Sequence, residues 1–383
     1  MSEKKEWEKT VAFTAAGDYR YETILQAVRR QFLLLELGQA VRPGMRVVLK
    51  PNLVMRRSPE QATTTHPMLV RCVAEELLAL GAGEVILAES PGGPYTRSAL
   101  EGIYQDCGMQ EAAHAAKIRL NDDFESVEIP SRRKKCCQSF NILRPVAKAD
   151  LVINLPKLKT HCMTVLSAGV KNLFGCVPGL QKPELHYRFP EETAFSEMLV
   201  ELAETLSPAF TIIDAIESMQ GDGPSSGEPY HTGFLAGSRS PFALDAALCP
   251  LLGLPEVRMI TVARQWGLVP TEEELLLYGD KIGPFAGFKA PCSKSLDFLD
   301  RFPAPLRPAV RTAAGALASP RPAINRRRCV GCGKCAQSCP AQIISVREGK
   351  ARIAGKGCIR CYCCHEMCPV KAVVVRRFWA FRL

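Results

Sequence analysis

The chain has 383 residues, of which 47% are apolar and 23% charged, and its formal net charge is +10. This composition is ordinary for folded globular domains, excludes an intrinsically disordered chain and leaves room for two domains. No run approaches the about 18 apolar residues of a transmembrane helix, and the start MSEKKEWEKTVAF lacks the apolar core of a secretory signal.

The basic charge bears on the partners of the protein, and the scattered cysteines bear on its cellular location. The basic runs at 132–135 and 326–328 lie in no recognisable nucleic-acid-binding motif, so we expect solvated surface there and no nucleic-acid partner. An anionic small molecule or an acidic redox partner fits the charge better. Of the 17 cysteines, nine (17 minus 8) lie outside two regular C-terminal motifs, which in a chain without a signal indicates reduced thiols and a cytoplasmic location.

Helices and strands are predicted to alternate along the larger part of the chain. Apolar residues at helical spacing predict a helix over 20–37, and Pro67 begins a second helix that ends at Leu80. Strands separated by helices indicate an α/β fold with a mostly parallel open sheet and flanking helices. Short apolar runs predict the buried strands at 45–49, 84–88, 150–155 and 210–213.

Polar side chains follow each of these predicted strands. In open sheets of this kind, ligands bind beyond the carboxyl ends of the strands. One polar residue there is more often a helix cap or a solvated loop residue, whereas several at equivalent positions indicate a ligand site. The polar residues at the predicted strand ends are Lys50, Asn52, Glu89, Ser90, Lys157, Lys159, His161 and Asp214.

The stretch from 157 to 190 is predicted to be irregular and carries similar chemistry. Its glycines let the backbone approach a ligand, and lysines beside amide groups suit phosphate or carboxylate. It has no P-loop order, and no G-x-G-x-x-G follows the early strands. His161 and Asp214 are the candidate catalytic residues, as proton donor or acceptor. The predicted residues that bind an anionic substrate are Lys50, Asn52, Lys159, Lys171 and Asn172.

Five motifs occur in a fixed order between residues 10 and 270: VVLKPNLV, TTTHP, NLPKLKTH, AGVKNLFGCVPG and IIDAIESMQGDGP. In order and identity they resemble the domain-of-unknown-function family 362. The resemblance implies an α/β domain, here assigned to residues 10–300, and brings no reaction with it. Members of that family often carry a C-terminal ferredoxin module. The chain departs from the pattern at Glu89, where the resemblance implies an aspartate, so the carboxylate is carried by a longer side chain.

A change of composition marks the C-terminal part. Residues 301–323 are rich in proline and alanine and predict a linker with a short helix over 307–318. Residues 324–377 hold two copies of C-x-x-C-x-x-C-x-x-x-C-P at an offset of 29 residues (358 minus 329), with β segments predicted at 343–346 and 373–375. The basic-aromatic tail at 378–383 either packs back onto the larger domain or docks on a membrane surface or a partner.

This cysteine spacing is typical of two-cluster bacterial ferredoxins and predicts a small α+β domain with two [4Fe-4S] clusters. In such modules the fourth cysteine of each copy, before the proline, binds the partner cluster. The first predicted ligand set is Cys329, Cys332, Cys335 and Cys368. The second predicted ligand set is Cys358, Cys361, Cys364 and Cys339. Zinc sites pair two C-x-x-C halves and fit this pattern poorly, and Cys363 is predicted to be a buried thiol and not a ligand.

Two functions follow from this combination. In the first, a redox enzyme, the clusters relay single electrons between a donor or acceptor protein and an anionic substrate or cofactor at the strand ends. In the second, a non-catalytic electron-transfer or docking protein, the larger domain binds a redox partner. Purely structural clusters are a third interpretation. A polar pocket at the strand ends favours the first function, and a site closed or filled by apolar side chains favours the second.

Overall fold

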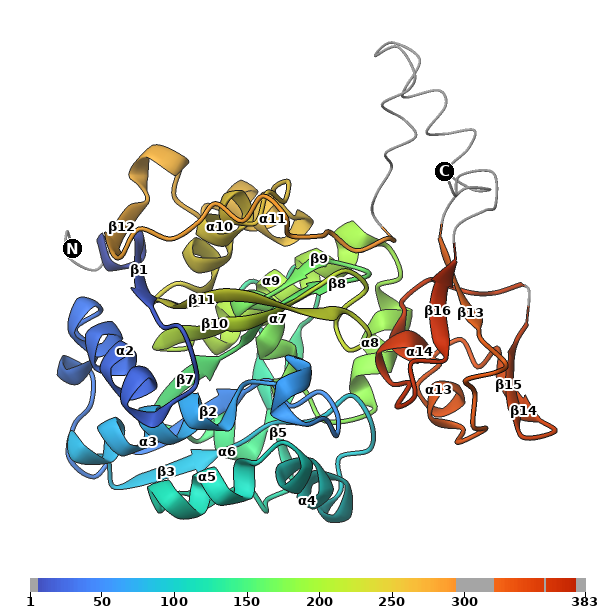
Figure 1. Ribbon diagram of the computed structural model, residues 1–383, viewed down its shortest axis with the longest axis horizontal. Coiled ribbons are helices and arrows are strands. Elements are labelled where there is room, and N and C mark those ends of the chain that lie inside the picture. The colour runs from blue at the N-terminus through green and yellow to red at the C-terminus, as the bar shows by residue number, and fades with distance from the viewer. Residues whose placement is uncertain (1–5, 294–319, 355, 377–383) are drawn as a thin grey trace, which may run out of the picture.

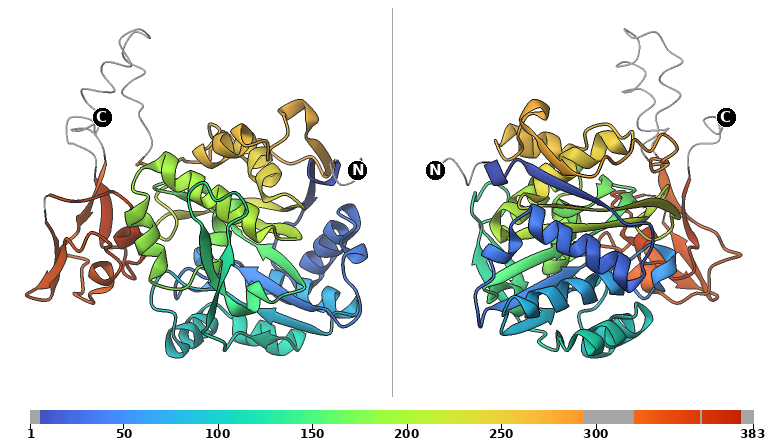
Figure 2. Two further views of the ribbon diagram at one scale, coloured as in Figure 1. Left: turned by 180° about the vertical axis from the view of Figure 1, so that it is seen from behind. Right: turned by 60° about the vertical axis from the view of Figure 1, so that its left-hand side comes forward.

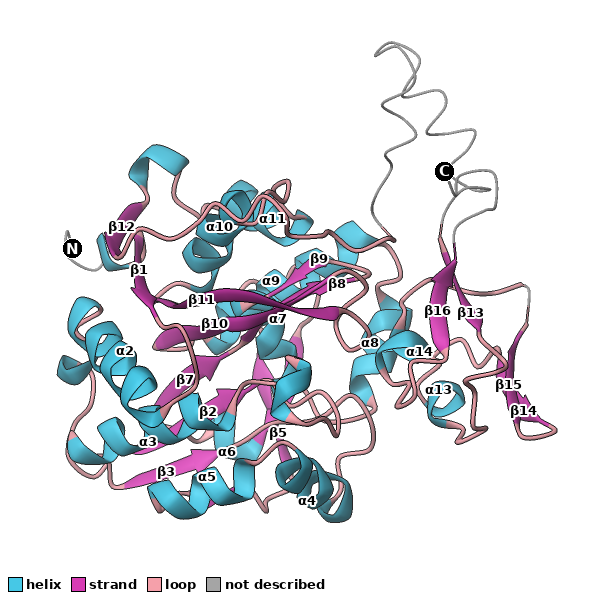
Figure 3. Cartoon of the chain, in the orientation of Figure 1, coloured by secondary structure: helices cyan, strands magenta, loops and turns pink. Residues whose placement is uncertain are grey.

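The computed structural model describes residues 6–293, 320–354 and 356–376. A ten-stranded sheet runs through residues 6–293 (Figures 1 and 3) in the order β12-β1-β11-β10-β7-β2-β3-β4, with β8 beside β10 and β9 beside β8. Its strands are β1 (Thr10–Ala15), β2 (Arg46–Pro51), β3 (Glu84–Leu87), β4 (Arg119–Leu120), β7 (Leu151–Leu155), β8 (Lys157–His161), β9 (Val165–Ser167), β10 (Phe210–Gln220), β11 (Glu228–Ser238) and β12 (Leu276–Gly279).

The centre of the sheet is parallel, from β10 through β7, β2 and β3 to β4. This confirms the predicted α/β fold, and β2, β3, β7 and β10 are the four predicted strands. Antiparallel pairing of β11 with β1 and with β10 makes the sheet mixed. Beyond its predicted end, β10 continues to Gln220 because β11 pairs with it there.

The start of the stretch predicted to be irregular is a strand. β8 is buried throughout and pairs with β10 and β9. The expectation of irregular structure was wrong here because Lys157 and Lys159 break the apolar pattern that marks a buried strand. Their side chains alternate with Leu158, as strand geometry requires.

Helices cover both faces of the sheet (Figures 1 and 2). Successive apolar side chains of β2 therefore face opposite sides of the sheet. Val47 and Leu49 pack with α2, α3, α4 and α5 on one face, and Val48 belongs to the core under α9, α10 and α11 on the other. These helices are α2 (Tyr21–Leu34), α3 (Pro67–Ala79), α4 (Arg97–Asp106), α5 (Met109–Ala116), α9 (Glu192–Leu206), α10 (Pro241–Leu251) and α11 (Arg258–Gln265).

Shorter elements complete the larger part. A hairpin of β5 (Ser126–Pro130) and β6 (Ser139–Leu143) stands beside the sheet. The short helices are α6 (Arg144–Ala147), α7 (Gly169–Asn172), α8 (Gln181–Arg188), η1 (Leu37–Gln39), η2 (Pro59–Gln61), η3 (Leu173–Cys176) and η4 (Glu272–Glu274). Of these, α7, η3 and α8 follow β9 and form the wall of the pocket described below.

The C-terminal part is a small module with an internal repeat. β13 (Arg321–Ile324) pairs with β16 (Val373–Arg376), and β14 (Ile344–Arg347) pairs with β15 (Lys350–Ile353). The segments predicted at 343–346 and 373–375 are thus strands, each within one residue of the prediction. Each cysteine loop contains one helical turn, α13 (Lys334–Gln337) and α14 (Cys363–Glu366).

The predicted linker and tail lie largely outside the described residues. β13 begins within the range predicted as a linker. The short helix predicted over 307–318 and the basic-aromatic tail at 378–383 both lie outside the described residues. In the ranges 6–293, 320–354 and 356–376, none of the helices combines the length and the apolar character needed to cross a bilayer.

Candidate functional site

The motif cysteines of the module gather in two groups, each drawn from both copies of the repeat. In the first group, Cys335 lies near the thiols of Cys329, Cys332 and Cys368. Burial raises the pKa of Cys335 above its ordinary value, and these three neighbouring thiols raise it further. Cys368 comes from the second copy, so the two copies share this group.

The second group surrounds Cys364. Burial raises the pKa of Cys364 well above its ordinary value, and the neighbouring thiols of Cys361, Cys339 and Cys358 add to the effect. Cys339 comes from the first copy. Cys335 of the first group also raises the pKa of Cys364, so the crossed ligand sets stay a prediction from the fourth cysteine before proline.

The crowded thiols fit a polynuclear iron–sulfur cofactor. Thiolates that raise one another's pKa are stabilised when positively charged iron lies between them. Cys363 is buried, and its hydrogen bond lowers the pKa of Cys361.

The second cysteine loop packs directly against the larger domain (Figures 1 and 2). Arg57 Nη1 donates to the carbonyl of Pro369 at 2.8 Å, directly after the loop. Ser225 Oγ donates to the carbonyl of Glu366 at 2.6 Å. These bonds fix α14 beside the carboxyl ends of the strands, so the Glu366 side chain, two residues after Cys364, enters the larger domain.

Glu366 closes a pocket at these strand ends. The cavity has a volume of about 40 Å³, which is room for about three water molecules. Its wall is formed by the ends of β2 and β3, by β8 and by the segment from α7 to α8. The lining residues are Asn52, Val54, Glu89, Ser90, Gly92, Lys159, Ser167, Lys171, Asn172, Phe174, Gly175, Lys182, Pro224 and Glu366.

Two of the pocket lysines are held by protein oxygens. Lys159 Nζ donates to Asn52 Oδ1 at 2.8 Å and to the carbonyl of Thr63 at 2.7 Å. Lys182 Nζ donates to Ser90 Oγ at 3.0 Å and to two backbone carbonyls. Burial lowers the pKa of each lysine to about 7. Both therefore change charge near neutral pH.

Lys50 forms a buried ion pair. Its Nζ contacts Glu89 Oε2 and donates to the carbonyl of Pro51 at 2.9 Å, and the two charged side chains are 0% and 4% exposed. Burial raises the pKa of Glu89, and Lys50 partly offsets this rise. Gly175 covers the pair, and a Cβ at that position would collide with both side chains. Lys50 is thus committed to Glu89 and does not line the cavity.

Lys171 differs from the other pocket lysines because its ammonium group has no hydrogen-bond partner among the described residues. The residue is 8% exposed and lines the cavity, with Nζ 5.9 Å from the centroid of the Phe174 ring. Burial lowers its pKa, while Glu366 opposes the shift. Because this ammonium group lines the cavity without a protein partner in the described ranges, it is available to an anion there.

His161 presents a second free donor. Its Nδ1 accepts hydrogen bonds from the backbone of Met163 and Thr164 at 3.1 and 3.3 Å, so the neutral ring carries its proton on Nε2. Buried Nε2 has no hydrogen-bond partner in the described part of the chain and lies 3.8 Å from Glu366 Oε2. Burial, and then Lys171, lower the pKa of His161 to about 3, so the ring is a neutral donor at pH 7.

Glu366 is held as an anion. Burial alone would raise its pKa, but His161 and Lys171 outweigh burial and keep the pKa well below its ordinary value. Its side chain is 17% exposed. The pocket thus contains the carboxylate of the cysteine module, facing two donors that it does not contact closely.

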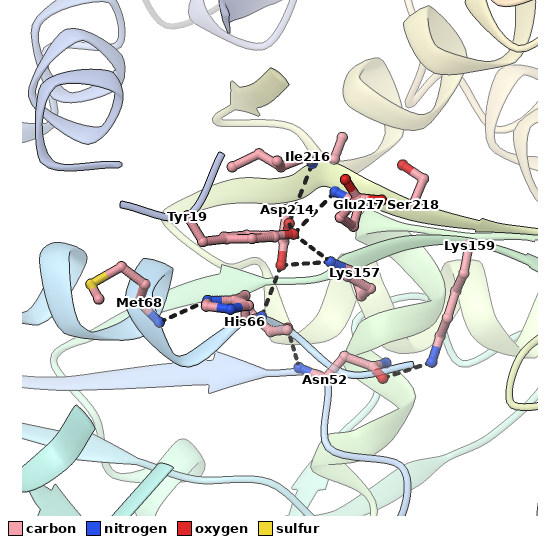
Figure 4. A network of polar contacts seen from close by, with 12 residues as sticks. Tyr19, Asn52, His66, Met68, Lys157, Lys159, Asp214, Ile216, Glu217 and Ser218 are labelled. Atoms are coloured by element: carbon pink, nitrogen blue, oxygen red, sulfur yellow. Dashed lines mark hydrogen bonds and ion pairs between the residues drawn. The ribbon is translucent and has the colours of Figure 1, made fainter. Parts of the chain in front are cut away.

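Asp214 belongs to a separate network (Figure 4). It accepts from Tyr19 Oη at 2.6 Å, from Lys157 Nζ at 2.9 Å and from the backbone N–H of His66 at 2.8 Å. Tyr19 also stacks on the His66 ring, with centroids 3.6 Å apart. Asp214 is 0% exposed and does not line the pocket. Neither of the two candidate catalytic residues, His161 and Asp214, is among the residues that line the cavity.

The predicted substrate-binding residues do lie together. Asn52 links Lys159 to Asn172, because its Nδ2 donates to Asn172 Oδ1 at 2.9 Å. Asn172 Nδ2 in turn donates to the carbonyl of Lys50 at 3.1 Å. Four of the five line the cavity, and Lys50 lies directly behind it.

Sequence reasoning missed Glu366. The repeat itself carries a signal, since the equivalent residue of the first copy is Gln337 (366 minus 29), which is exposed. A carboxylate that replaces an amide in one copy only, inside a cysteine loop, marks the side of the module that faces a basic surface.

Comparisons with known proteins place the chain in a family. Residues 47–250 match the Domain of unknown function (DUF362), and residues 321–369 match a 4Fe-4S dicluster domain. The chain is 36% identical over 278 residues to the thylakoid-associated protein sll1697 of Synechocystis sp., covering 70% of this chain and 82% of that protein.

Two solved structures are distantly similar. The lactate racemase apoprotein of Thermoanaerobacterium thermosaccharolyticum aligns with a TM-score of 0.42 and 13% identity, over 65% of this chain and 59% of that one. A protein from Thermotoga maritima aligns with a TM-score of 0.33 and 11% identity, over 56% of this chain and 55% of that one. The dicluster domain makes the present chain an iron–sulfur protein of the electron-transfer type, with a redox partner. The chain belongs to the DUF362 family and carries a C-terminal 4Fe-4S dicluster domain.

Proposed function

We propose that the protein passes single electrons between a redox partner and a small anionic molecule bound in the pocket at the strand ends. Two [4Fe-4S] clusters supply the electron relay. The proposed ligands of the first cluster are Cys329, Cys332, Cys335 and Cys368. The proposed ligands of the second cluster are Cys358, Cys361, Cys364 and Cys339.

The position of Glu366 carries this proposal. Glu366 lies two residues after Cys364 and reaches the cavity lined by Lys159 and Lys171. Glu366 also lies two residues before Cys368 of the first group, whereas Cys332 of that group is exposed. This arrangement supports a path from a partner at exposed Cys332 to a ligand beside Glu366.

The residues of the pocket have distinct proposed roles. Lys171, and Lys159 when charged, hold the anion. The neutral ring of His161 donates a hydrogen bond from Nε2 and polarises the bound group without carrying charge itself. Asp214 opposes the lowering of the Lys157 pKa by burial, and its saturated hydrogen bonds favour a positioning role over proton transfer to a substrate.

Reoxidation of the reduced clusters tests the proposal. Full-length protein with its clusters is reduced without oxygen and mixed with a panel of small carboxylates and phosphates, and cluster oxidation is followed by visible absorbance and paramagnetic resonance. We expect one class of anion to reoxidise the clusters. Lys171→Met should slow this reaction about tenfold or more, because a charge-assisted hydrogen bond contributes about 1.5–3 kcal/mol.

Exposed Lys334 provides the matched control. Lys334→Met removes a lysine from the module without touching the pocket and should react like the wild type. Clusters that no member of the panel reoxidises, or equal rates in the two variants, would contradict the proposed reaction.

The alternative, a non-catalytic electron-transfer or docking protein, draws support from the small cavity, about 40 Å³ with Glu366 in place. In that case an acidic redox protein should exchange electrons with the clusters at the same rate in the wild type and in Lys171→Met, and no small anion should do so.

A further inference from the structure

We propose that the pocket is a carboxylate-binding site and that Glu366 is an internal carboxylate which occupies it until a small carboxylate from solution displaces it. This inference rests on the proposed function, since it names the class of the anion. It concerns a binding equilibrium, which can be measured without any electron transfer.

Two donors, Lys171 in the cavity lining and His161 buried beside Glu366, match the two oxygens of one carboxylate. Lys171 Nζ has no hydrogen bond and no ion pair within the described ranges, although the residue is 92% buried (100 minus 8). Buried His161 Nε2 also has no hydrogen-bond partner there. Buried donors are nearly always satisfied in native proteins, so a ligand is expected beside His161 Nε2. His161 does not line the cavity, but Glu366, whose Oε2 is 3.8 Å from His161 Nε2, lines it together with Lys171.

Glu366 fits these donors loosely. Its Oε2 is 3.8 Å from His161 Nε2, which is beyond hydrogen-bond distance, and no carboxylate in the described residues lies within 4.0 Å of Lys171 Nζ. The Glu366 carboxylate is tethered to the backbone of α14. A free carboxylate is not tethered in this way and can approach both donors to about 2.8 Å.

The charges of the pocket require an anion when Glu366 leaves. Four lysines, at positions 50, 159, 171 and 182, face two carboxylates, at positions 89 and 366. Removing the second carboxylate changes the formal balance from +2 to +3 in a buried site. Leaving a buried charge unpaired is strongly unfavourable, so Glu366 and an external anion compete for the same place.

The module does not need the Glu366 carboxylate in order to stay docked. Its other attachments use different atoms: the Arg57 bond to Pro369, the Ser225 bond to the Glu366 carbonyl, and a contact of 3.0 Å between His365 Nε2 and the carbonyl of Asp222. A rotation of the Glu366 side chain can therefore clear the donors while α14 remains in place.

Binding of acetate to cluster-loaded, oxidised protein tests the inference by calorimetry. If Glu366 occupies the site for about nine tenths of the time, the apparent Kd for acetate is about tenfold weaker than that of the open site. We expect Glu366→Gln to tighten acetate binding about tenfold. Exposed Glu348 of the same module is the control, and Glu348→Gln should bind acetate like the wild type.

Further variants make the result specific. Glu366→Asp, which keeps the charge but retracts the carboxylate, should bind acetate with an affinity between those of the wild type and Glu366→Gln. Adding Lys171→Met to Glu366→Gln should abolish the increase in acetate affinity. Iron content and the thermal midpoint check that each variant folds with its clusters.

Two results would overturn the inference. Unchanged or weaker acetate binding in Glu366→Gln would mean that Glu366 is not a competitor. If Glu366→Gln increased the affinity for inorganic phosphate as much as the affinity for acetate, the site would not be selective for carboxylates. Acetate binding as predicted, together with clusters that no anion reoxidises, would instead contradict the proposed function alone.

Discussion

Replacing Lys50 by methionine is expected to destabilise the larger domain by about 3–5 kcal/mol, the usual cost of leaving one partner of a buried ion pair alone. The pair with Glu89 is almost completely buried, at 0% and 4% exposure. Gly175 packs directly over both side chains, so water reaches the remaining carboxylate only from the small cavity that Glu89 lines. Because burial raises the pKa of Glu89, protonation of the lone carboxylate limits the loss to the lower part of this range.

A double-mutant cycle measures the interaction energy between Lys50 and Glu89 apart from their contacts with other residues. Lys50→Met and Glu89→Leu should each destabilise, whereas the double variant should recover most of the loss, since a buried ion pair and an apolar pair of similar volume differ little in stability. We expect a coupling energy of about 2–4 kcal/mol. For the partly exposed i,i+4 pair Arg71–Glu75, which has an N–O distance of 2.8 Å, the same cycle should give about 0.3–0.5 kcal/mol.

Chemical denaturation followed by circular dichroism, with the clusters intact and without oxygen, measures these energies. A loss of about 3 kcal/mol corresponds to a fall of about 6 °C in Tm for a domain of this size. Additive effects of the two single substitutions, or a coupling no larger than that of Arg71 and Glu75, would refute the reasoning that burial makes the Lys50–Glu89 pair essential.

The cysteine module, the domain contact and the pocket each lead to one further prediction. Cys332→Ser should reduce the bound iron whereas Cys363→Ser should not, and equal iron and sulfide contents would contradict the ligand assignment. A Cβ at Gly92 would lie 2.5 Å from Met367 Sδ, so Gly92→Val should loosen the module, and an unchanged rate of proteolytic separation of the two domains would argue against this contact. Burial lowers the pKa of Lys159 to about 7; the lysine is cationic below that pH and neutral above it. Acetate binding should therefore weaken as the pH rises from about 6 to about 8, and this dependence should be smaller in Lys159→Met, which calorimetry at several pH values can check.

Local patterns were sufficient for the cofactor module and for much of the sheet. The cysteine spacing predicts the crossed groups because three ligands lie in one tight loop and the fourth is displaced by a single residue, which is information held within about ten residues. The apolar runs predict β2, β3, β7 and β10 because central parallel strands are buried on both faces. Strand β8 was not predicted because Lys157 and Lys159 interrupt its apolar pattern. These two lysines are buried only because they have partners that lie far away in the sequence.

The grouping of polar side chains at the strand ends was also predictable, but the role of each side chain was not. The carboxyl ends of parallel strands share one edge of a sheet, so Asn52 and Lys159 were expected to meet there. Whether each side chain is free or committed depends on its partners. Asp214 is enclosed by the Tyr19 hydroxyl and by Lys157, and no periodicity in the sequence records such long-range hydrogen bonds.

The amino-acid sequence by itself determined that the protein has an α/β domain and a module whose cysteine spacing suits two iron–sulfur clusters, because both depend on regular local spacing. Only the tertiary structure decided where the two meet. Glu366 and His161 are 205 residues apart (366 minus 161), and their approach depends on the docking of one folded surface on another. That docking places a carboxylate of the cysteine loop among buried lysines, and it is the physical reason for expecting the electrons of the module to reach this pocket.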